Sequence, residues 1–280
     1  MDLGVISAIL LAAFLHAFWN FLVRETSDKT VGMAAVVYGH LPLALVGLAW
    51  FGLPKIEALA YILASSVLHV GYQVFLMNSY RFGGLTQVYP IARGSAPLII
   101  VLISVIISTD NLKYLEILGI LTVSLGILLH GVSQFNKDSF GPTGLILAIF
   151  TGAFIASYSL VDGTGTRVAL NAISYYGALT IGNCILFTIY LCIFNPGVFK
   201  RLLSDGKYTF FVGGSASYLA YVLVLWACLT LPIAVVASIR ETSVLFALGL
   251  GFLFLREEIT FKKVVHSTVI LLGIVVLHLA

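Results

Sequence analysis

The sequence predicts an all-helical, polytopic membrane protein with ten transmembrane helices in two five-helix inverted repeats. Three observations lead to this prediction: the composition, the length of the apolar stretches and an internal repeat. Of the 280 residues, 60% are hydrophobic and only 10% are charged, and the mean hydropathy is +1.07. A soluble domain carries about 25% charged residues. A soluble fold cannot hide that much apolar surface, so the chain must lie in a lipid bilayer.

The apolar residues form continuous runs of the length that a bilayer requires, which is about 20 residues for a helix. A β-barrel would instead show short segments of alternating polarity. The first run is too long, and too poor in basic residues at its start, for a cleaved signal peptide, so we expect it to stay. The 26 glycines are typical of transmembrane helices that pack closely. The predicted spans are 3–23, 31–52, 58–80, 85–108, 115–133, 142–160, 172–194, 208–228, 232–254 and 261–279.

Two arginines reveal an internal repeat. When GLTQVYPIARGSAPLIIV, which begins at Gly84, is aligned with LPIAVVASIRETSVLFAL, which begins at Leu231, Arg93 falls on Arg240 at an offset of 147 residues. The same offset carries Asp110 onto Glu257 and Gly126 onto Gly273. A register that holds over more than thirty residues indicates a duplicated unit.

The repeat divides the chain into residues 1–133, a polar linker at 134–141 and residues 142–280. Each half holds five predicted spans, so the second half must enter the membrane from the opposite side. Inverted repeats of this kind are typical of secondary transporters, in which rocking of the halves exposes one central site to each side in turn. The loops are short and leave no room for a further domain.

The basic residues of the loops predict an orientation. Ten Lys and Arg residues follow odd-numbered spans and three follow even-numbered spans. By the positive-inside rule the odd loops are cytoplasmic, which places both termini outside.

The sequence lacks the motifs that are typical of several other classes of function. The net charge of +3 is spread over the loops without a basic face, which disfavours nucleic-acid binding. Cys184, Cys192 and Cys228 lie in apolar spans without metal-ligand spacing, so no metal, cofactor or disulfide framework is indicated. The chain has no GxxxxGK[ST] loop for ATP and no HExxH or GxSxG motif, and we therefore expect neither ATP coupling nor an enzyme.

Arg93 and Arg240 are the first candidate site residues. A guanidinium group in hydrocarbon costs roughly 2.5–3.5 kcal/mol on insertion scales, so it persists where it faces an interior or a partner. We expect both arginines to line a cavity from opposite sides and to bind an anionic group of a substrate. The alternative is that a carboxylate neutralises each of them and holds helices together. Pro90 and Pro97 should loosen or kink the helix near Arg93.

Glu241 directly follows Arg240, and consecutive helical residues point about 100° apart, so the two should not share a face. Three roles remain open for Glu241. It could pair with Arg93, bind the ammonium group of a zwitterionic substrate, or exchange a proton that drives transport.

Polar and aromatic residues recur at helical spacing on other spans and make stripes that must face inward. Aromatic walls with a few polar groups are typical of small-molecule cavities. Bonding between helices is the alternative for each residue. The predicted substrate-binding residues, besides the arginines, are His16, Trp19, Asn20, His69, Tyr72, Gln73, Tyr89, Tyr158, Tyr218 and Tyr221.

The chain resembles the drug/metabolite transporter superfamily, in its ten-span branch of duplicated EamA domains. The resemblance rests on LAAFLHAFWN (11–20), on NSYRFGGLTQVYPIARGSAPLIIVLISVI and LEILGILTVSLGILLHG in the first half, and on the stretch from WACLTLPIAVVASIRETSVLFAL to the end. It implies a helical bundle with a central cavity lined by spans 1, 3, 4, 6, 8 and 9. It also implies cytoplasmic termini, against the charge count. The first span has no membrane-embedded glutamate of the kind that small multidrug exporters use.

Taken together, the sequence predicts a secondary transporter of the prokaryotic plasma membrane that moves a small organic metabolite with an anionic group. An amino acid, carboxylate, sulfonate or phosphonate fits this description. A proton or another ion is a candidate for coupling. The alternatives are a broad-specificity drug or metabolite exporter and, more remotely, a non-transporting membrane sensor or subunit.

Overall fold

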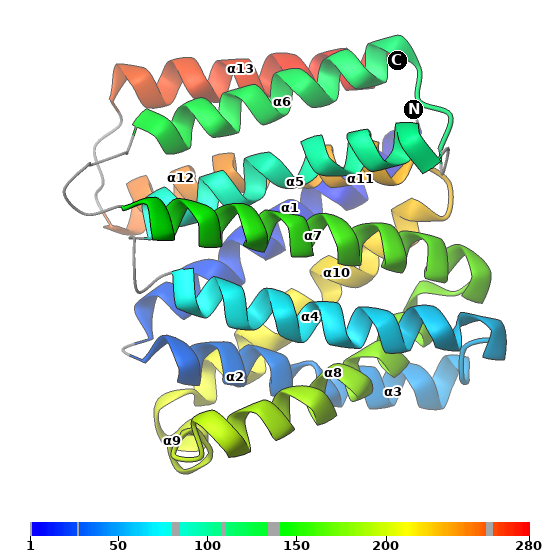
Figure 1. The fold of residues 1–280 in the computed structure, drawn as a ribbon, viewed down its shortest axis with the longest axis vertical. Coiled ribbons are helices and arrows are strands. Elements are labelled where there is room, and N and C mark those ends of the chain that lie inside the picture. The colour runs from blue at the N-terminus through cyan, green and yellow to red at the C-terminus, as the bar shows by residue number, and fades with distance from the viewer. Residues whose placement is uncertain (1, 27, 80–84, 108–109, 134–140, 256–259) are drawn as a thin grey trace.

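The computed structural model describes residues 2–26, 28–79, 85–107, 110–133, 141–255 and 260–280, and in this part of the chain every regular element is a helix (Figure 1). The elements are α1 (Leu3–Glu25), α2 (Lys29–Gly39), α3 (Leu41–Phe51), η1 (Ile56–Ala58), α4 (Leu59–Ser79), α5 (Leu85–Ile107), α6 (Tyr114–Ser133), α7 (Pro142–Ala169), α8 (Ala172–Phe194), α9 (Val198–Asp205), η2 (Thr209–Gly213), α10 (Gly214–Cys228), α11 (Ile233–Arg240), α12 (Ser243–Leu255) and α13 (Phe261–Leu279).

The ten predicted spans are confirmed, since ten helical stretches of the described residues are long and apolar enough to cross a bilayer. Their ends are fixed by local capping. The carboxylate of Asp2 accepts hydrogen bonds from two backbone N–H groups at the start of α1, and Asp28 and Asn171 do the same for α2 and α8. The sixth span is longer than predicted and reaches Ala169.

Two of the spans are broken in the middle. The second span divides at His40, because Pro42 has no N–H group and its ring would clash with the carbonyl group four residues before it. The ninth span divides after Arg240. There the backbone N–H groups of Glu241 and Thr242 donate hydrogen bonds to the carbonyl groups three residues earlier, with N–O distances of 3.1 and 3.0 Å. These bonds are typical of a 3₁₀ turn. The eighth span begins with the π-helical turn η2.

The two prolines of the fourth span lie within one continuous helix. Pro90 and Pro97 both lie inside α5, which runs without interruption from Leu85 to Ile107. The break in this part of the fold belongs to the corresponding span of the second half, at Glu241. That span has no proline at the break, and the predicted loosening or kink of α5 at Pro90 and Pro97 stays a prediction.

The packing of corresponding helices is compatible with an inverted repeat. α6 and α13 occupy the same place in the two halves and run antiparallel, because Lys113, just before α6, bonds to Ala280, just after α13. They approach closely at glycines: a Cβ atom on Gly126 would lie 2.7 Å from the Ile270 side chain, and one on Gly273 would lie 2.7 Å from the Val123 backbone nitrogen. α1 packs on α10 and α12, and α7 packs in the same way on α4 and α5. The division at 134–141 stays a prediction, since 134–140 lie outside the described residues.

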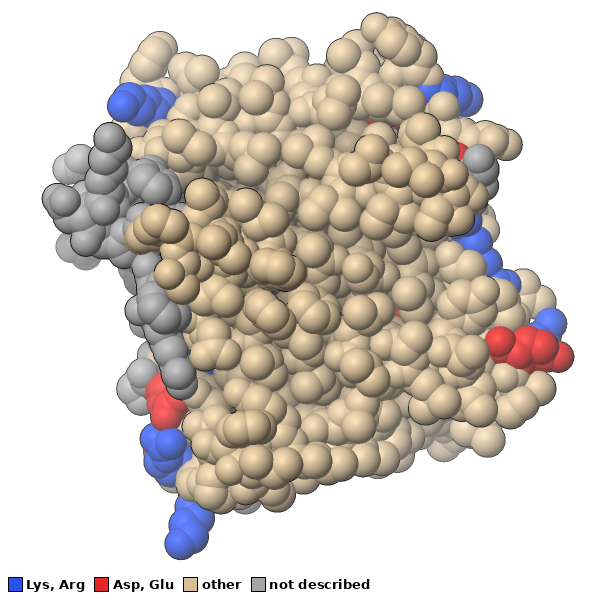
Figure 2. Space-filling view, in the orientation of Figure 1, with Lys and Arg blue, Asp and Glu red and all other residues tan. Residues whose placement is uncertain are grey.

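The outer surface has the polarity that a lipid environment requires. Figure 2 shows charged side chains gathered at two opposite edges, with a surface almost free of charged residues between them. Large apolar side chains such as Ile106, Leu253 and Leu271 are more than half exposed on this surface. The protein is therefore an integral membrane protein. Both termini lie at one of the charged edges (Figure 1).

Candidate functional site

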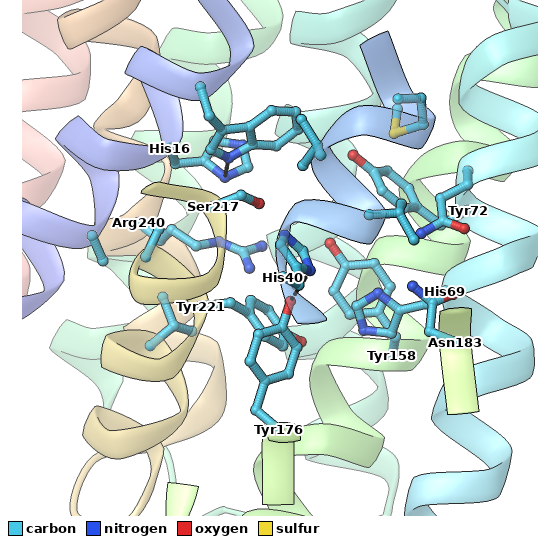
Figure 3. A pocket seen from close by; sticks show the side chains of 18 residues that line it. His16, His40, His69, Tyr72, Tyr158, Tyr176, Asn183, Ser217, Tyr221 and Arg240 are labelled. Carbon is cyan, nitrogen blue, oxygen red and sulfur yellow. Dashed lines mark hydrogen bonds between the residues drawn. The ribbon is translucent and has the colours of Figure 1, made fainter. Parts of the chain in front are cut away.

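A cavity lies inside the helical bundle, between the two halves (Figure 3). Its volume is about 60 Å³, which is room for a few water molecules. The walls come from seven of the helical spans, and the second span contributes its break at His40. The lining residues are Ala12, His16, Trp19, Met33, Val36, Val37, His40, His69, Tyr72, Gln73, Tyr158, Tyr176, Asn183, Ser217, Ala220, Tyr221, Val224 and Arg240.

The structure brings most of the predicted residues together at this cavity. The helical stripes of α1 and α4 both face it, as their spacing predicts, and the indole nitrogen of Trp19 lies 3.2 Å from Nδ1 of His16. Figure 3 shows Arg240 reaching in from α11, with His69 and Tyr158 on the opposite side. The predicted residues that line the cavity are His16, Trp19, His69, Tyr72, Gln73, Tyr158, Tyr221 and Arg240.

Other predicted residues lie elsewhere. Arg93 is not among the residues that line this cavity, and its predicted role in substrate binding stays a prediction. The Asn20 side chain donates to the carbonyl group of His16 at 2.8 Å, which is a bond within its own helix. Tyr218 is buried against the ring of Tyr176, with ring centres 5.0 Å apart. The side chain of Tyr89 lies outside the described residues.

Arg93, Glu241 and Arg240 form a buried ionic cluster. Nε of Arg93 lies 3.1 Å from Oε2 of Glu241, and Nη2 of Arg240 lies 3.5 Å from Oε1. Nη2 of Arg93 also donates to the hydroxyl of Ser243 at 3.3 Å. All three ionic side chains are at most 4% exposed. Of the three roles considered for Glu241, the geometry shows the ion pair with Arg93.

The expectation that Arg240 and Glu241 point apart is wrong, because it assumed a regular helix. α11 ends at Arg240, and the tight turn that follows redirects the chain before α12 begins. The Glu241 carboxylate thereby reaches both guanidinium groups. One carboxylate serves two arginines, which leaves the cluster with one positive charge.

A second buried polar cluster surrounds Asp162 of α7. Its carboxylate is fully buried and accepts hydrogen bonds from Tyr175 at 3.0 Å and from Tyr221 at 2.5 Å. Nε2 of His69 lies 3.0 Å from the same carboxylate. The His69 ring stacks on Tyr158, with ring centres 4.3 Å apart. Four helices therefore meet at one carboxylate, beside the cavity.

A third cluster closes the edge of the bundle that holds the chain termini. Nη1 of Arg167, at the end of α7, lies 2.8 Å from Asp110, and its other nitrogens donate to the carbonyl groups of Cys228 and Leu231. Asp110 also accepts from the backbone N–H group of Ile233 at 2.8 Å. We call these five residues the terminal clasp. A small cavity of about 10 Å³ lies between Arg240, Cys228 and Ile233, on the way from the main cavity to the clasp.

Comparisons with known proteins identify the second half of the chain. Residues 142–279 match the family model described as the EamA-like transporter family. Residues 142–279 are an EamA-like transporter domain. The resemblance to the drug/metabolite transporter superfamily is thereby confirmed, and it makes the EamA protein a membrane transporter of that type.

The fold of the EamA protein also occurs among solved structures, of which 27 chains are similar to it. One is a protein of known crystal structure that is 16% identical in sequence. The similarity covers 98% of each chain with a TM-score of 0.75. At this identity the likeness concerns the fold alone. No curated protein matches the sequence.

The cavity of the EamA protein has walls that sequence reasoning missed. The resemblance implied spans 1, 3, 4, 6, 8 and 9, whereas the cavity is lined by spans 2 and 7 as well, and no described side chain of span 4 lines it. The signals were weak: His40 stands two residues before Pro42, and Asn183 is a lone amide in an apolar span. Asp162, four residues after Tyr158 on the same helical face, is the residue that sequence reasoning could have assigned. The missed polar lining residues are His40, Tyr176, Asn183 and Ser217.

Proposed function

We propose that the EamA protein is a secondary transporter for a small organic metabolite with an anionic group, and that Arg240 binds that group. The observation that supports this proposal is the burial and incomplete hydrogen bonding of the Arg240 side chain. It lines the cavity and is 3% exposed; among the described residues its Nε atom has no hydrogen-bond partner, and its Nη2 atom has only the ionic contact with Glu241 at 3.5 Å. A buried guanidinium group with unused donors is costly unless a ligand completes it.

The charge of the ionic cluster supports an anion over a cation. Arg93 and Arg240 share the single carboxylate of Glu241, so the cluster keeps one positive charge beside the cavity. A carboxylate, sulfonate or phosphonate would neutralise it and could accept two parallel hydrogen bonds from the planar guanidinium group.

The rest of the cavity suits the organic part of such a substrate. Trp19, Tyr72, Tyr158, Tyr176 and Tyr221 supply aromatic walls, and a few amide and hydroxyl groups lie among them. Aromatic walls also attract an ammonium group, which would suit an amino acid or an aminated phosphonate.

The small size of the cavity supports transport by alternating access. Ligand pockets usually measure about 300–1,000 Å³, far more than the about 60 Å³ found here. The cavity must therefore widen to admit a substrate. The breaks at His40 and Glu241 are the places where spans can bend, and the terminal clasp closes one end. The absence of an ATP-binding loop favours an ion gradient in a prokaryotic plasma membrane as the energy source.

The test is transport into proteoliposomes that contain the purified protein. The probes are radiolabelled L-glutamate, taurine and 2-aminoethylphosphonate, compared with choline and tetraphenylphosphonium. We expect at least one anionic probe to exchange across the membrane. Arg240→Ala should cost about 2 kcal/mol or more of binding, or about thirty-fold in affinity. Arg201→Ala, at a half-exposed arginine far from the cavity, is the matched control.

Each alternative predicts a different pattern. A broad-specificity exporter would transport the hydrophobic cation, and Arg240→Ala would leave that transport intact. A sensor would be stabilised thermally by one probe without moving any of them. Transport of cations alone, or anion transport that is unchanged in Arg240→Ala, would contradict the proposal.

A further inference from the structure

Among the described residues, no Lys or Arg forms an ion pair with Asp162, a carboxylate buried inside a membrane protein. Arg93 and Arg240 are both engaged with Glu241, and the nearest basic group to Asp162 is His69, at 3.0 Å. Asp162 is fully buried. A charged carboxylate in such a place is expensive, and membrane proteins keep one mainly where it serves a substrate, an ion or a proton.

The bonding around Asp162 suits a proton better than a metal ion. Tyr175 and Tyr221 each point a hydroxyl hydrogen at the carboxylate, and His69 contacts it through a ring nitrogen. A metal ion needs acceptor atoms, and the described residues contain no group of three acidic, His or Cys side chains that could hold one. A His–Asp pair, in contrast, can take up a proton without losing its hydrogen bond.

The pair is connected to the cavity through His69. Asp162 itself does not line the cavity, but His69 and Tyr221 line it and contact Asp162. A proton that enters from the cavity therefore reaches the His69 ring first. Nε2 is bonded to the carboxylate, so the incoming proton binds at Nδ1, and the ring then carries a positive charge that Asp162 balances. The proton leaves from the same atom.

The groups near the pair are known for every element that packs on α7. Among the described residues, tyrosines make up most of this shell, and the Arg93–Glu241–Arg240 cluster supplies fixed charges. His40, at the break of the second span, faces His69, and Arg167 and Asp110 lie beyond Cys228. Glu57 of η1 is exposed. The facing groups are Tyr61 and His69 from α4, Arg93 from α5, Tyr158 from α7 itself, Tyr175 and Tyr176 from α8, Tyr221 and Cys228 from α10, and Arg240 from α11.

We infer that His69 and Asp162 form a proton-binding site that couples anion transport to the proton gradient, so that proton and anion cross together. This inference rests on the proposed anion transport. It moves the coupling role away from Glu241, because the arginines hold that carboxylate.

The physical basis of the coupling is the total charge around the cavity. With neutral His69, the negative charge of Asp162 offsets the single positive charge of the arginine cluster. A proton on His69 restores the positive charge and so strengthens anion binding at Arg240 through the low dielectric of the interior. By linkage, a bound anion strengthens proton binding by the same factor.

The test uses the same proteoliposomes and the same anionic probes, with the membrane potential clamped at zero. One proton per anion predicts that the transported probe accumulates about ten-fold for each unit of pH gradient. Asp162→Asn and His69→Gln keep a polar side chain of similar size and should abolish this accumulation. Asp162→Asn, at a residue that does not line the cavity, should still exchange probe for probe at equal pH. Asp205→Asn, at an exposed carboxylate, is the matched control.

The outcomes separate the two proposals. If exchange occurs but a pH gradient drives no accumulation, the proton site is refuted and the anion transporter stands. If no anionic probe exchanges, the proposed function fails, and infrared spectra of the reconstituted protein decide the proton site. A pH-dependent carboxyl or imidazole band that disappears in Asp162→Asn and His69→Gln supports the site, and the lack of such a band overturns it.

Discussion

The carboxylate of Glu241 joins the two halves of the EamA protein, because its Oε2 atom lies 3.1 Å from Nε of Arg93, which is 148 positions earlier in the chain. Glu241 follows Arg240, which corresponds to Arg93 in the repeat. In the predicted repeat both copies carry an arginine in the membrane, and the adjacent carboxylate in only one copy breaks their equivalence. Arg93 becomes the structural partner and Arg240 the one that faces the cavity.

The ionic cluster predicts an order of stability among variants. Glu241→Gln leaves two buried guanidinium groups without a carboxylate and should lower the free energy of unfolding by about 3–5 kcal/mol. The double variant Arg93→Met with Glu241→Met keeps the net charge of the original cluster and should be more stable than Glu241→Gln alone. Thermal unfolding in detergent measures both, with the exposed Glu57→Gln as the control. Equal unfolding temperatures for all variants would contradict the prediction.

The terminal clasp predicts a change in access to a native cysteine. Cys228 is buried beside the clasp, and its carbonyl group accepts from Arg167 at 2.8 Å. Arg167→Gln should open this edge and raise the rate at which a membrane-impermeant maleimide labels Cys228 by several-fold. The exposed Cys192 is first replaced by serine to remove its signal.

The control for the clasp is Lys113→Gln, which removes an exposed contact at the same edge without touching Arg167. A labelling rate that stays the same in Arg167→Gln would show that the clasp does not close this end.

The contact between α2 and the π-helical turn predicts a strong effect at one glycine. A Cβ atom on Gly39 would lie 2.1 Å from the carbonyl oxygen of Phe210 and 2.9 Å from Cα of Gly214, and both are backbone atoms that cannot move aside. Gly39→Ala should therefore lower the unfolding temperature markedly. Gly249→Ala is the matched control, because its Cβ atom would meet nothing within 4 Å. There the change should be neutral or stabilise the helix by about 0.5–1 kcal/mol. Similar unfolding temperatures for both variants would contradict the close contact.

The contacts of Asp28 predict that the stability of the fold depends on pH in the acidic range. Burial of Asp28 opposes its ionisation, but the N–H groups of Thr30 and Val31 and the charge of Arg201 outweigh this, so its pKa is lowered from 3.8. Such a group stabilises the fold at pH values above 3.8, and this contribution is lost as the pH falls through the lowered pKa. Asp28→Asn should weaken the acid dependence of thermal unfolding. An unchanged pH profile would refute this.

The sequence by itself determined the membrane location, the number of spans and the faces of α1 and α4. These properties depend on local signals, namely the length of apolar runs and the spacing of polar residues along one helix. The internal repeat was also predicted from the sequence, since Arg93 and Arg240 lie in similar sequence segments. The transporter class followed from that text, and the matching family model confirmed it for the second half.

Only the tertiary structure decided which polar groups meet. His69 and Asp162 are 93 positions apart, and nothing in either helix encodes the other. Helices that are apolar on every side give little indication of which face lies inward, because lipid chains and the protein interior are similarly apolar. The break after Arg240 has no proline to signal it in the sequence, whereas the break at His40 follows from Pro42. The packing of helices across the bundle determines which groups contact a buried carboxylate. The sequence of a single span does not specify these partners.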